Sequence, residues 1–288
     1  MKIALIREGK IPADSRVVLS PEQAAEVQKK FPGVQVICQS SEIRCFTDKQ
    51  YREQGIEVVK DISDCDILLG VKEVPIPELI PDKTYFFFSH TIKKQPYNRI
   101  LLQNILEKNI RLIDYERLTE PNGERVVAFG RFAGIVGAYN GLYTFGQKYQ
   151  LYDIRRAKDC YDMEDLKKEY AKIQLPAIKI ALTGTGRVGQ GAAEVLDGVG
   201  IRKVTTAEYL EQDFQEPVYT QLEVTDYNRK KEGGAFSQQE FFDHPEKFEP
   251  GFAPYTQVTD LFIAGAFWDH RAPVLFYRED MMQEGFKI

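Results

Sequence analysis

The chain has 288 residues, which is enough for about two domains of ordinary size. With 38 basic and 43 acidic residues its net charge is −5, and it lacks the basic stripe that polyphosphate binding requires, so nucleic acid is not expected as a partner. Hydrophobic residues make up 43% and charged residues 28%, which excludes a disordered or fibrous chain. No apolar run approaches the roughly 20 residues of a membrane-spanning helix, so no membrane contact is expected.

The cysteines and the first residues indicate the compartment. The chain has four cysteines, Cys38, Cys45, Cys65 and Cys160. They form no CxxC pair and have no histidine at zinc-finger spacing, so no metal site is predicted. Charged residues from Arg7 onward interrupt the apolar start of the chain before it reaches signal-peptide length. We therefore expect reduced thiols in a cytoplasmic protein.

The first 115 residues alternate short apolar strands with helices. Strands are predicted at residues 2–7, 34–38, 66–71, 85–88 and 111–115. Two helices open with capping boxes, Ser20 with Gln23 and Thr47 with Gln50, and a third helix is predicted at residues 96–108. This alternation predicts an α/β fold with a mostly parallel sheet that is covered on both faces.

The composition changes in the middle of the chain. Glycine, alanine and aromatic residues dominate from Phe129 to Ala138 and continue into a predicted helix that ends near Gln147. Glycines at this density allow two backbones to approach closely, so we expect a tightly packed crossing between two domains. A polar helix is predicted at residues 162–173, and a second α/β block begins after Pro176.

A glycine-rich motif in this second block carries the clearest chemistry. The predicted strand at residues 178–183 is followed by Gly184-Thr185-Gly186-Arg187-Val188-Gly189 and by a helix to about residue 199. In such a motif the first glycine turns the chain, the second lets a pyrophosphate approach the backbone, and the third packs helix on strand. The N–H groups at the helix N-terminus hold the phosphates. The predicted cofactor-binding residues are Gly184, Gly186, Arg187, Val188 and Gly189.

The acidic residue that completes this motif is not at its expected place. An Asp or Glu at the end of the second strand would bind the adenosine ribose 2′-hydroxyl. The predicted second strand, residues 203–206, ends instead at Thr206, and the nearest acid is Glu208, which a solvated turn would equally explain. We place Thr206 at the cofactor. NAD is the expected cofactor, but Thr206 cannot reject a 2′-phosphate by charge, so NADP stays open.

Several segments resemble the superfamily of alanine dehydrogenase and saccharopine dehydrogenase. They are Arg7–Lys10, Ser15–Pro21, Val71–Pro75, Phe88–His90 and the glycine-rich motif. Three more are similar to the lysine-forming saccharopine dehydrogenase branch, namely residues 90–93, 114–130 and 133–137. The resemblance implies two doubly wound, Rossmann-like α/β domains with a cleft between them. The substrate-binding domain would span residues 1–134 and the dinucleotide-binding domain residues 135–288.

The resemblance also implies a reaction, the reversible oxidation of a C–N bond with hydride transfer to the nicotinamide and hydrolysis of the imine. Lys72 and His90 each follow a predicted strand, at the edge where α/β proteins bind ligands, and the resemblance assigns them acid–base roles. A histidine can shuttle protons near neutral pH, and a partly desolvated lysine can act as a base on the amine. Glu116 is expected to pair with Lys72 and set its charge.

Three further residues are candidates for binding the substrate. Arg16 and Arg125 can grip carboxylates in bidentate geometry, and Lys93 is expected to hold a second carboxylate. Each residue has a simpler alternative. His90 could be a structural histidine, the arginines could make surface ion pairs, and Lys93 could lie with Lys94 on a solvated face.

Two questions stay open at this point. The last three residues, Phe286–Ile288, have the pattern of a further strand, and the resemblance implies more sequence beyond them, so we expect an incomplete, C-terminally truncated dinucleotide-binding domain. The function could also be alanine dehydrogenase-like oxidative deamination, which needs one carboxylate binder, or a non-catalytic dinucleotide-binding module. The expected partner is a small-molecule amino acid, and an oligomer is possible.

Overall fold

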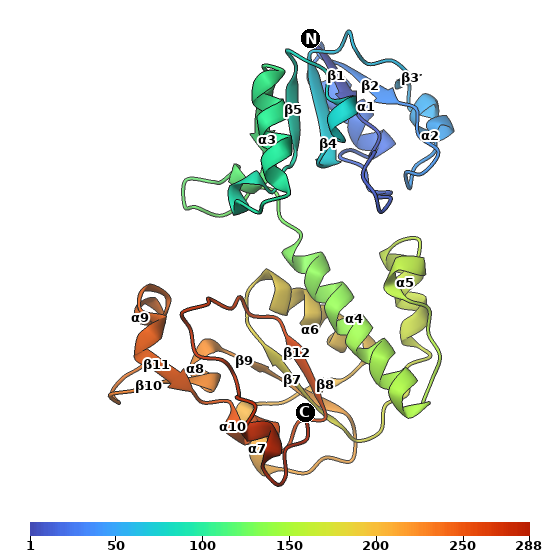
Figure 1. Cartoon of the computed structure of the whole chain (residues 1–288). Helices are drawn as coiled ribbons and strands as arrows, with labels where there is room; N and C mark the ends of the chain where they lie inside the picture. Colours follow the sequence, from blue (N-terminus) through green and yellow to red (C-terminus); the bar gives the residue numbers. More distant parts are fainter. The chain divides into compact units, whose positions relative to one another are not determined.

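The computed structural model describes residues 1–288, which divide into two compact units, Met1–Ala128 and Phe129–Ile288 (Figure 1). Both units are α/β with parallel sheets, which confirms the predicted fold class. The predicted boundary after residue 134 falls inside helix α4 (Gly130–Tyr149), which belongs entirely to the second unit. None of the helices is long and apolar enough to cross a membrane.

The first unit contains a six-stranded parallel sheet with the order β3-β2-β1-β4-β5-β6. The strands are β1 (Lys2–Leu5), β2 (Gln35–Gln39), β3 (Glu57–Val59), β4 (Ile67–Lys72), β5 (Thr84–Phe88) and β6 (Arg111–Asp114). Five of them were predicted, whereas β3 is too short to show an alternating pattern. The chain reverses its direction of winding between β1 and β4, and ligands of such sheets bind beyond the carboxyl ends of the strands at this point.

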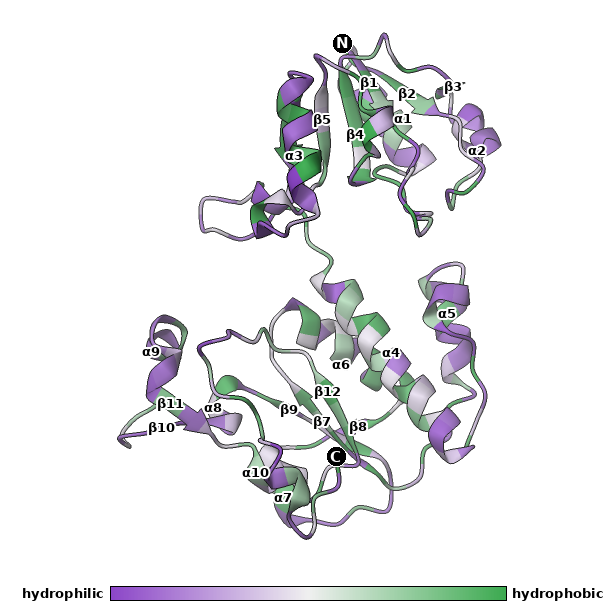
Figure 2. Cartoon of the chain, in the orientation of Figure 1, coloured by the Kyte–Doolittle hydropathy of each residue, from purple (hydrophilic) through white to green (hydrophobic).

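Helices cover both faces of this sheet. They are α1 (Pro21–Lys30), α2 (Asp48–Glu53) and α3 (Asn98–Glu107). Both predicted capping boxes are present at the starts of α1 and α2. The neighbouring residues Ala4 and Leu5 of β1 belong to different buried clusters, so both faces of the strand are covered. Figure 2 shows the corresponding pattern, with apolar strands and with polar outer faces on the helices.

The second unit has a four-stranded parallel sheet with the order β12-β7-β9-β8. Its strands are β7 (Lys179–Thr183), β8 (Arg202–Lys203), β9 (Val218–Leu222) and β12 (Leu261–Ala264). The helices besides α4 are α5 (Met163–Tyr170), α6 (Arg187–Val199), α7 (Thr206–Glu211), α8 (Val224–Tyr227) and α10 (Ala253–Thr256). A hairpin of β10 (Asn228–Lys230) and β11 (Phe248–Pro250) encloses α9 (Gln238–Asp243).

The predicted strand at Phe286–Ile288 is wrong. This segment forms no strand, and the N–H group of Lys287 donates to the carbonyl of Thr256 at 2.9 Å. Three residues with apolar side chains at the first and third positions are too few to distinguish a strand from an irregular segment that packs on a core.

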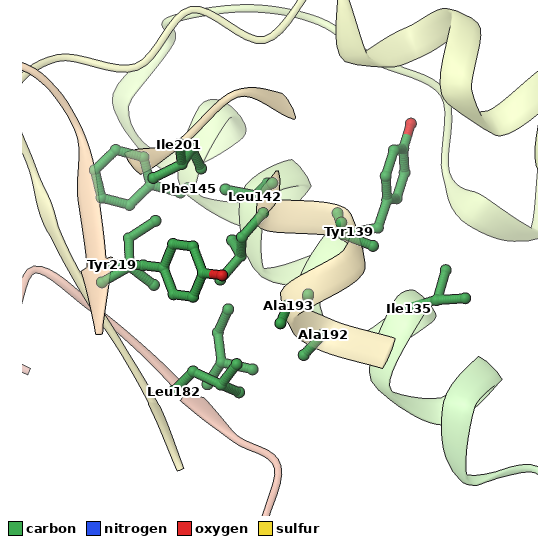
Figure 3. Packing of buried hydrophobic residues seen from close by; sticks show 14 of the residues in the cluster. Ile135, Tyr139, Leu142, Phe145, Leu182, Ala192, Ala193, Ile201 and Tyr219 are labelled. Carbon is green, nitrogen blue, oxygen red and sulfur yellow. The ribbon is translucent and has the colours of Figure 1, made fainter. Parts of the chain in front are cut away.

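The glycine-rich helix α4 packs directly on α6. A Cβ atom on Gly134 would lie 1.9 Å from the carbonyl oxygen of Val188, and a Cβ on Gly191 would lie 2.0 Å from that of Arg131. The predicted close approach is therefore present, but it joins two helices of the second unit. Figure 3 shows the core that follows from it, where Ile135, Tyr139 and Leu142 of α4 lie beside Ala192 and Ala193 of α6.

We expect Gly134→Ala to destabilise the second unit by about 1–3 kcal/mol, because the added methyl group forces the two helix backbones apart. Gly137→Ala on the same helix is the matched control, since a Cβ there meets nothing within 4 Å. It should leave stability unchanged or raise it by up to about 1 kcal/mol. Urea unfolding followed by the fluorescence of Trp268 measures both variants, and equal stabilities would contradict the role of Gly134.

Candidate functional site

Five of the predicted site residues meet at the carboxyl edge of the first sheet. Lys72 is the last residue of β4, His90 follows β5, and Glu116 lies in the 3-10 helix η3 (Tyr115–Arg117) directly after β6. Together with Lys93 and Arg125 they form a group that we name the carboxyl-edge cluster. The sheet order places β5 between β4 and β6, so His90 stands between the other two positions.

Glu116 connects most of the carboxyl-edge cluster. Its Oε2 lies 3.1 Å from Nδ1 of His90, and its Oε1 lies 3.4 Å both from Nζ of Lys93 and from Nη1 of Arg125. Burial of the carboxyl would by itself raise the pKa of Glu116, but the hydrogen bond from His90 and the charge of Lys93 outweigh it and lower this pKa. The carboxylate therefore stays ionised near neutral pH.

The expected pair between Glu116 and Lys72 is wrong. Glu116 follows β6 and Lys72 ends β4, and β5 separates these two strands. Lys72 contacts His90 instead, with Nζ 3.4 Å from Nε2. When Nδ1 of His90 donates its proton to Glu116, Nε2 presents its lone pair to Lys72. Lys72, His90 and Glu116 thus form a continuous path for a proton.

The backbone around His90 is fixed by its neighbours. His90 has a φ of +56°, in the left-handed region that a non-glycine residue rarely adopts. Asn98 donates to its carbonyl at 3.2 Å, and the preceding Ser89 donates its hydroxyl to Asp114. The same Asp114 carboxylate accepts the N–H of Glu116 at 2.9 Å. One aspartate therefore sets the spacing between His90 and Glu116.

Arg16 is held by a carboxylate that the sequence analysis missed. Nε of Arg16 lies 2.9 Å and 3.2 Å from the two carboxylate oxygens of Asp14. Hydrogen bonds from Arg16 are the main cause of a lowered pKa of Asp14, and the positive charge of Lys72 acts in the same direction. A substrate carboxylate at Arg16 would therefore have to share the guanidinium with Asp14. The spacing Asp-x-Arg was the available signal.

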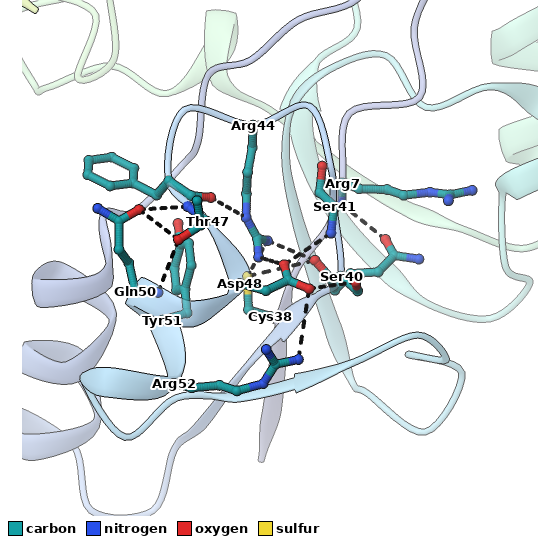
Figure 4. A network of polar contacts seen from close by, with 12 residues as sticks. Arg7, Cys38, Ser40, Ser41, Arg44, Thr47, Asp48, Gln50, Tyr51 and Arg52 are labelled. Atoms are coloured by element: carbon teal, nitrogen blue, oxygen red, sulfur yellow. Dashed lines mark hydrogen bonds and ion pairs between the residues drawn. The ribbon is translucent and has the colours of Figure 1, made fainter. Parts of the chain in front are cut away.

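A buried arginine braces the loop next to this pair. Arg44 donates from Nη1 to Sγ of Cys38 at 2.6 Å and from Nε to the carbonyl of Phe46 at 2.8 Å, and it forms an ion pair with Asp48 (Figure 4). The loop that Arg44 holds donates the N–H of its Cys45 to the carbonyl of Ser15 at 2.7 Å, directly before Arg16. Burial raises the pKa of Cys38 to about 11, so its thiol stays neutral, and none of the four cysteines is paired.

The predicted glycine-rich loop connects β7 to α6 in the second unit. Gly184 has a φ of +94°, and a Cβ there would lie 2.8 Å from the backbone nitrogen of Ala266. A Cβ on Gly189 would lie 1.9 Å from the carbonyl oxygen of Gly184, so only glycine allows the helix to start this close to the strand. Next to Gly186 there is open space, which is what the approach of a pyrophosphate to the backbone requires.

A cavity of about 730 Å³ opens beside this loop. Its volume lies in the range of cofactor and small-molecule sites. Its walls come from three places, the loop itself, the segment that follows β12, and the hairpin insertion with α9. The aromatic lining residues are Tyr227, Phe241, Phe242, Phe267 and Trp268, and polar groups come from Arg187, Asn228, Gln238 and Asp269. The residues present therefore fit a dinucleotide with its phosphates at the N-terminus of α6.

The strand next to β7 is not the predicted one. The neighbour of β7 is β9, and β8, which was expected there, lies one strand further out. Thr206 begins α7 after β8, so the reasoning that put it at the ribose is wrong. Glu208 completes the capping box of that helix with Thr205, as the alternative of a solvated turn implied.

Glu223 takes the place that was expected for an acidic residue. It follows β9 directly and is exposed, and the carbonyl of the preceding Leu222 accepts the N–H of Gly184 at 2.9 Å. The end of the neighbouring strand, beside the first glycine, is where an acid reaches an adenosine ribose. The signal in the sequence was the run Val218–Leu222, rich in residues that favour strands, before Glu223, but the long connection after β8 obscured it.

Comparisons with known proteins agree on a superfamily. Residues 4–136 match the family described as alanine dehydrogenase/PNT, N-terminal domain. Mitochondrial alpha-aminoadipic semialdehyde synthase of Bos taurus is 32% identical over 304 residues, which cover 96% of this chain and 32% of that protein. Saccharopine dehydrogenase (NAD(+), L-lysine-forming) of Yarrowia lipolytica is 26% identical over 255 residues, which cover 83% of this chain and 64% of that protein.

A solved structure supports the fold. An L-alanine dehydrogenase matches with a TM-score of 0.57 at 18% identity, covering 99% of this chain and 72% of that chain. The chain spans about a third of the length of the bovine relative, 32%.

The lowered pKa of Glu116 leads to a prediction about stability. In the unfolded chain a glutamate has a pKa of about 4.3, and in the folded protein the pKa of Glu116 is lower. The ionised Glu116 therefore stabilises the fold above about pH 4.3, and this stabilisation is lost as the pH falls through the pKa of the folded state. Glu116→Gln should therefore lower the melting temperature at pH 7, and the difference from the wild type should shrink below about pH 4. Thermal unfolding followed by circular dichroism measures this.

Glu107→Gln, an exposed change on α3, is the control and should show no such convergence. A difference between wild type and Glu116→Gln that stays constant from neutral to acidic pH would contradict an ionised, stabilising Glu116.

Proposed function

Because the chain belongs to the superfamily of alanine dehydrogenase and saccharopine dehydrogenase, we propose that it is a nicotinamide-dependent amino-acid oxidoreductase of the lysine-forming saccharopine dehydrogenase type. The single observation that supports this most is the contact path from Lys72 through His90 to Glu116. Such an enzyme oxidises a C–N bond to an imine, which water hydrolyses to an amine and an oxo acid. The nicotinamide, when bound, accepts the hydride.

The carboxyl-edge cluster supplies the proton transfers of this reaction. Lys72 takes the proton of the substrate amine and passes it to Nε2 of His90, at 3.4 Å. The imidazolium that results is stabilised by the ionised Glu116 at Nδ1. His90 then returns protons during the hydrolysis of the imine. Glu116 acts here as the residue that orients the histidine and compensates its charge.

The half-exposed cationic side chains of the carboxyl-edge cluster favour a substrate with more than one carboxylate. Lys93 and Arg125 share the single carboxylate of Glu116, and both side chains are about half exposed, at 46% and 49%. A substrate such as saccharopine brings several carboxylates to these half-exposed cationic groups, whereas alanine brings one. Arg16, with Asp14, is the proposed site for another substrate carboxylate.

The proposed cofactor is NAD, held by the loop of Gly184, Gly186, Arg187, Val188 and Gly189. Glu223 favours NAD over NADP, because a carboxylate at the end of β9 accepts hydrogen bonds from a ribose diol and repels a 2′-phosphate. The cavity of about 730 Å³ beside the loop offers the room for the nucleotide.

The test of the proposed function is a spectrophotometric assay of NADH oxidation by the purified chain. We expect oxidation with lysine plus 2-oxoglutarate and little with pyruvate plus ammonia. Turnover only with pyruvate and ammonia would replace the proposal by an alanine dehydrogenase-type reaction. No turnover with either pair, while NADH still binds, would favour a dinucleotide-binding module.

The proposed proton path predicts the effect of substitutions at Lys72 and His90. Lys72→Met and His90→Gln should each lower kcat by about 100-fold or more, the usual contribution of general acid–base catalysis, and should leave the Kd of NADH within about twofold. Lys49→Met, whose side chain is 83% exposed, is the control for the loss of a lysine. Steady-state rates and NADH fluorescence titration measure both quantities, and unchanged rates would remove the two residues from the mechanism.

The coenzyme proposal gives a third prediction. Glu223→Ser should weaken NADH binding by about tenfold and improve the binding of NADPH, since it removes a charged hydrogen-bond acceptor and a negative charge. Glu208→Ser, whose carboxylate caps α7, should leave the ratio of the two Kd values unchanged. If the two variants behave alike, Glu223 does not face the ribose.

A further inference from the structure

The end of β4 is irregular at the place where Lys72 emerges. Leu69 pairs with Phe86 and Lys72 with Phe88, so three steps along β4 correspond to two steps along β5. One extra residue is therefore inserted between Leu69 and Lys72, as in a β-bulge. Bulges break the alternation of side chains, and here Gly70 and Val71 are both buried although they are neighbours. The irregularity thus changes the face on which Lys72 lies.

A bulge leaves backbone N–H groups without partners in the sheet, and here the side chain of a glutamate accepts their hydrogen bonds. Glu8 accepts the N–H of Val71 at 2.6 Å through Oε1 and the N–H of Lys72 at 2.9 Å through Oε2. The segment of Glu8 follows β1, the neighbour of β4 on the other side from β5. The carboxylate therefore continues the hydrogen bonding of β1 beyond its last paired residue, Leu5, at the point where the sheet reverses its winding.

The position of this carboxylate is unusual for a glutamate. Glu8 is only 8% exposed, and burial raises its pKa although the two N–H groups act against this. The ionisable groups that act on it electrostatically are Asp14, Arg16 and the buried Tyr115. A carboxyl group is costly to bury, so two backbone hydrogen bonds at consecutive residues indicate a specific requirement for two acceptors.

We propose that Glu8 is a positioning residue, whose two carboxylate oxygens hold the bulged end of β4 so that Lys72 faces Nε2 of His90. The hydrogen bonds that Glu8 accepts come from backbone N–H groups, so it acts on Lys72 through the backbone. The expected effect on turnover rests on the proposed function. The expected effect on the position of Lys72 rests only on the geometry of the first unit. An error of about 1 Å in the position of a catalytic group can cost roughly 100-fold in rate.

Two substitutions of Glu8 test this proposal. Glu8→Gln keeps the shape but offers one oxygen to two N–H donors, and Glu8→Asp keeps the charge but withdraws the carboxylate by one methylene. Both should lower kcat with lysine and 2-oxoglutarate by roughly 10- to 100-fold and leave the KM of NADH unchanged. The control is Glu107→Gln, on the exposed face of α3, which should behave as wild type. Wild-type kcat in folded Glu8→Gln would overturn the proposal. Wild-type kcat in Glu8→Asp alone would also overturn it, because Glu8 would then act through its charge and not through the position of its two oxygens.

A spectroscopic readout separates this inference from the proposed function. The chain has three histidines, His90, His244 and His270, so their imidazole ¹⁵N signals can be assigned one by one. In both Glu8 variants the Nε2 signal of His90 should shift, because Lys72 moves away from it, while the signals of His244 and His270 stay in place. An unshifted His90 signal in the folded variants would overturn the positioning role. If the wild type does not turn over lysine and 2-oxoglutarate, the proposed function fails, and the His90 signal still decides on Glu8.

Discussion

The carboxylate of Glu116 holds together three nitrogen donors from two separate segments of the first unit. His90 follows β5, Lys93 ends the next turn, and Arg125 lies on the loop after η3, and each contacts one of the two oxygens within 3.4 Å. Without this negative charge the cationic groups would repel one another at the edge of the sheet. The ring of His90 would also lose its contact with Glu116 at Nδ1. The position of His90 beside Lys72 therefore depends on the ionised Glu116 and on Asp114, which sets the distance between Glu116 and His90.

In the second unit the corresponding constraint is the absence of side chains. Gly134, Gly189 and Gly191 each lie where a Cβ would come within about 2 Å of a carbonyl oxygen, from 1.9 to 2.0 Å. These contacts bring α4 and β7 so close to α6 that the N-terminus of α6 opens directly above the end of β7. The geometry of the glycine-rich loop and the packing of the core are thus consequences of the same close approach.

The sequence carried the parts of this structure that have local signals. Capping residues such as Ser20 and Thr47 mark helix starts, and the glycine-rich loop could be placed between strand and helix because its spacing is set by backbone sterics. The resemblance to a superfamily led to the members of the carboxyl-edge cluster. The partner of Glu116 was mistaken because it depends on the order of strands in the sheet. The same cause hid Glu223, since nothing local shows that β9 rather than β8 lies beside β7.

The proposed function requires that a hydride passes from the nicotinamide to an imine carbon of the substrate. The most direct test is isotope transfer. The chain is incubated with lysine, 2-oxoglutarate and NADH that carries deuterium at C4 of the nicotinamide, and the amino-acid product is analysed by mass spectrometry. The proposed function predicts saccharopine with one deuterium on the newly formed C–H bond, and only from one of the two C4 epimers of the labelled NADH. Deuterium that stays on the nucleotide, with no heavier product from either epimer, would contradict it.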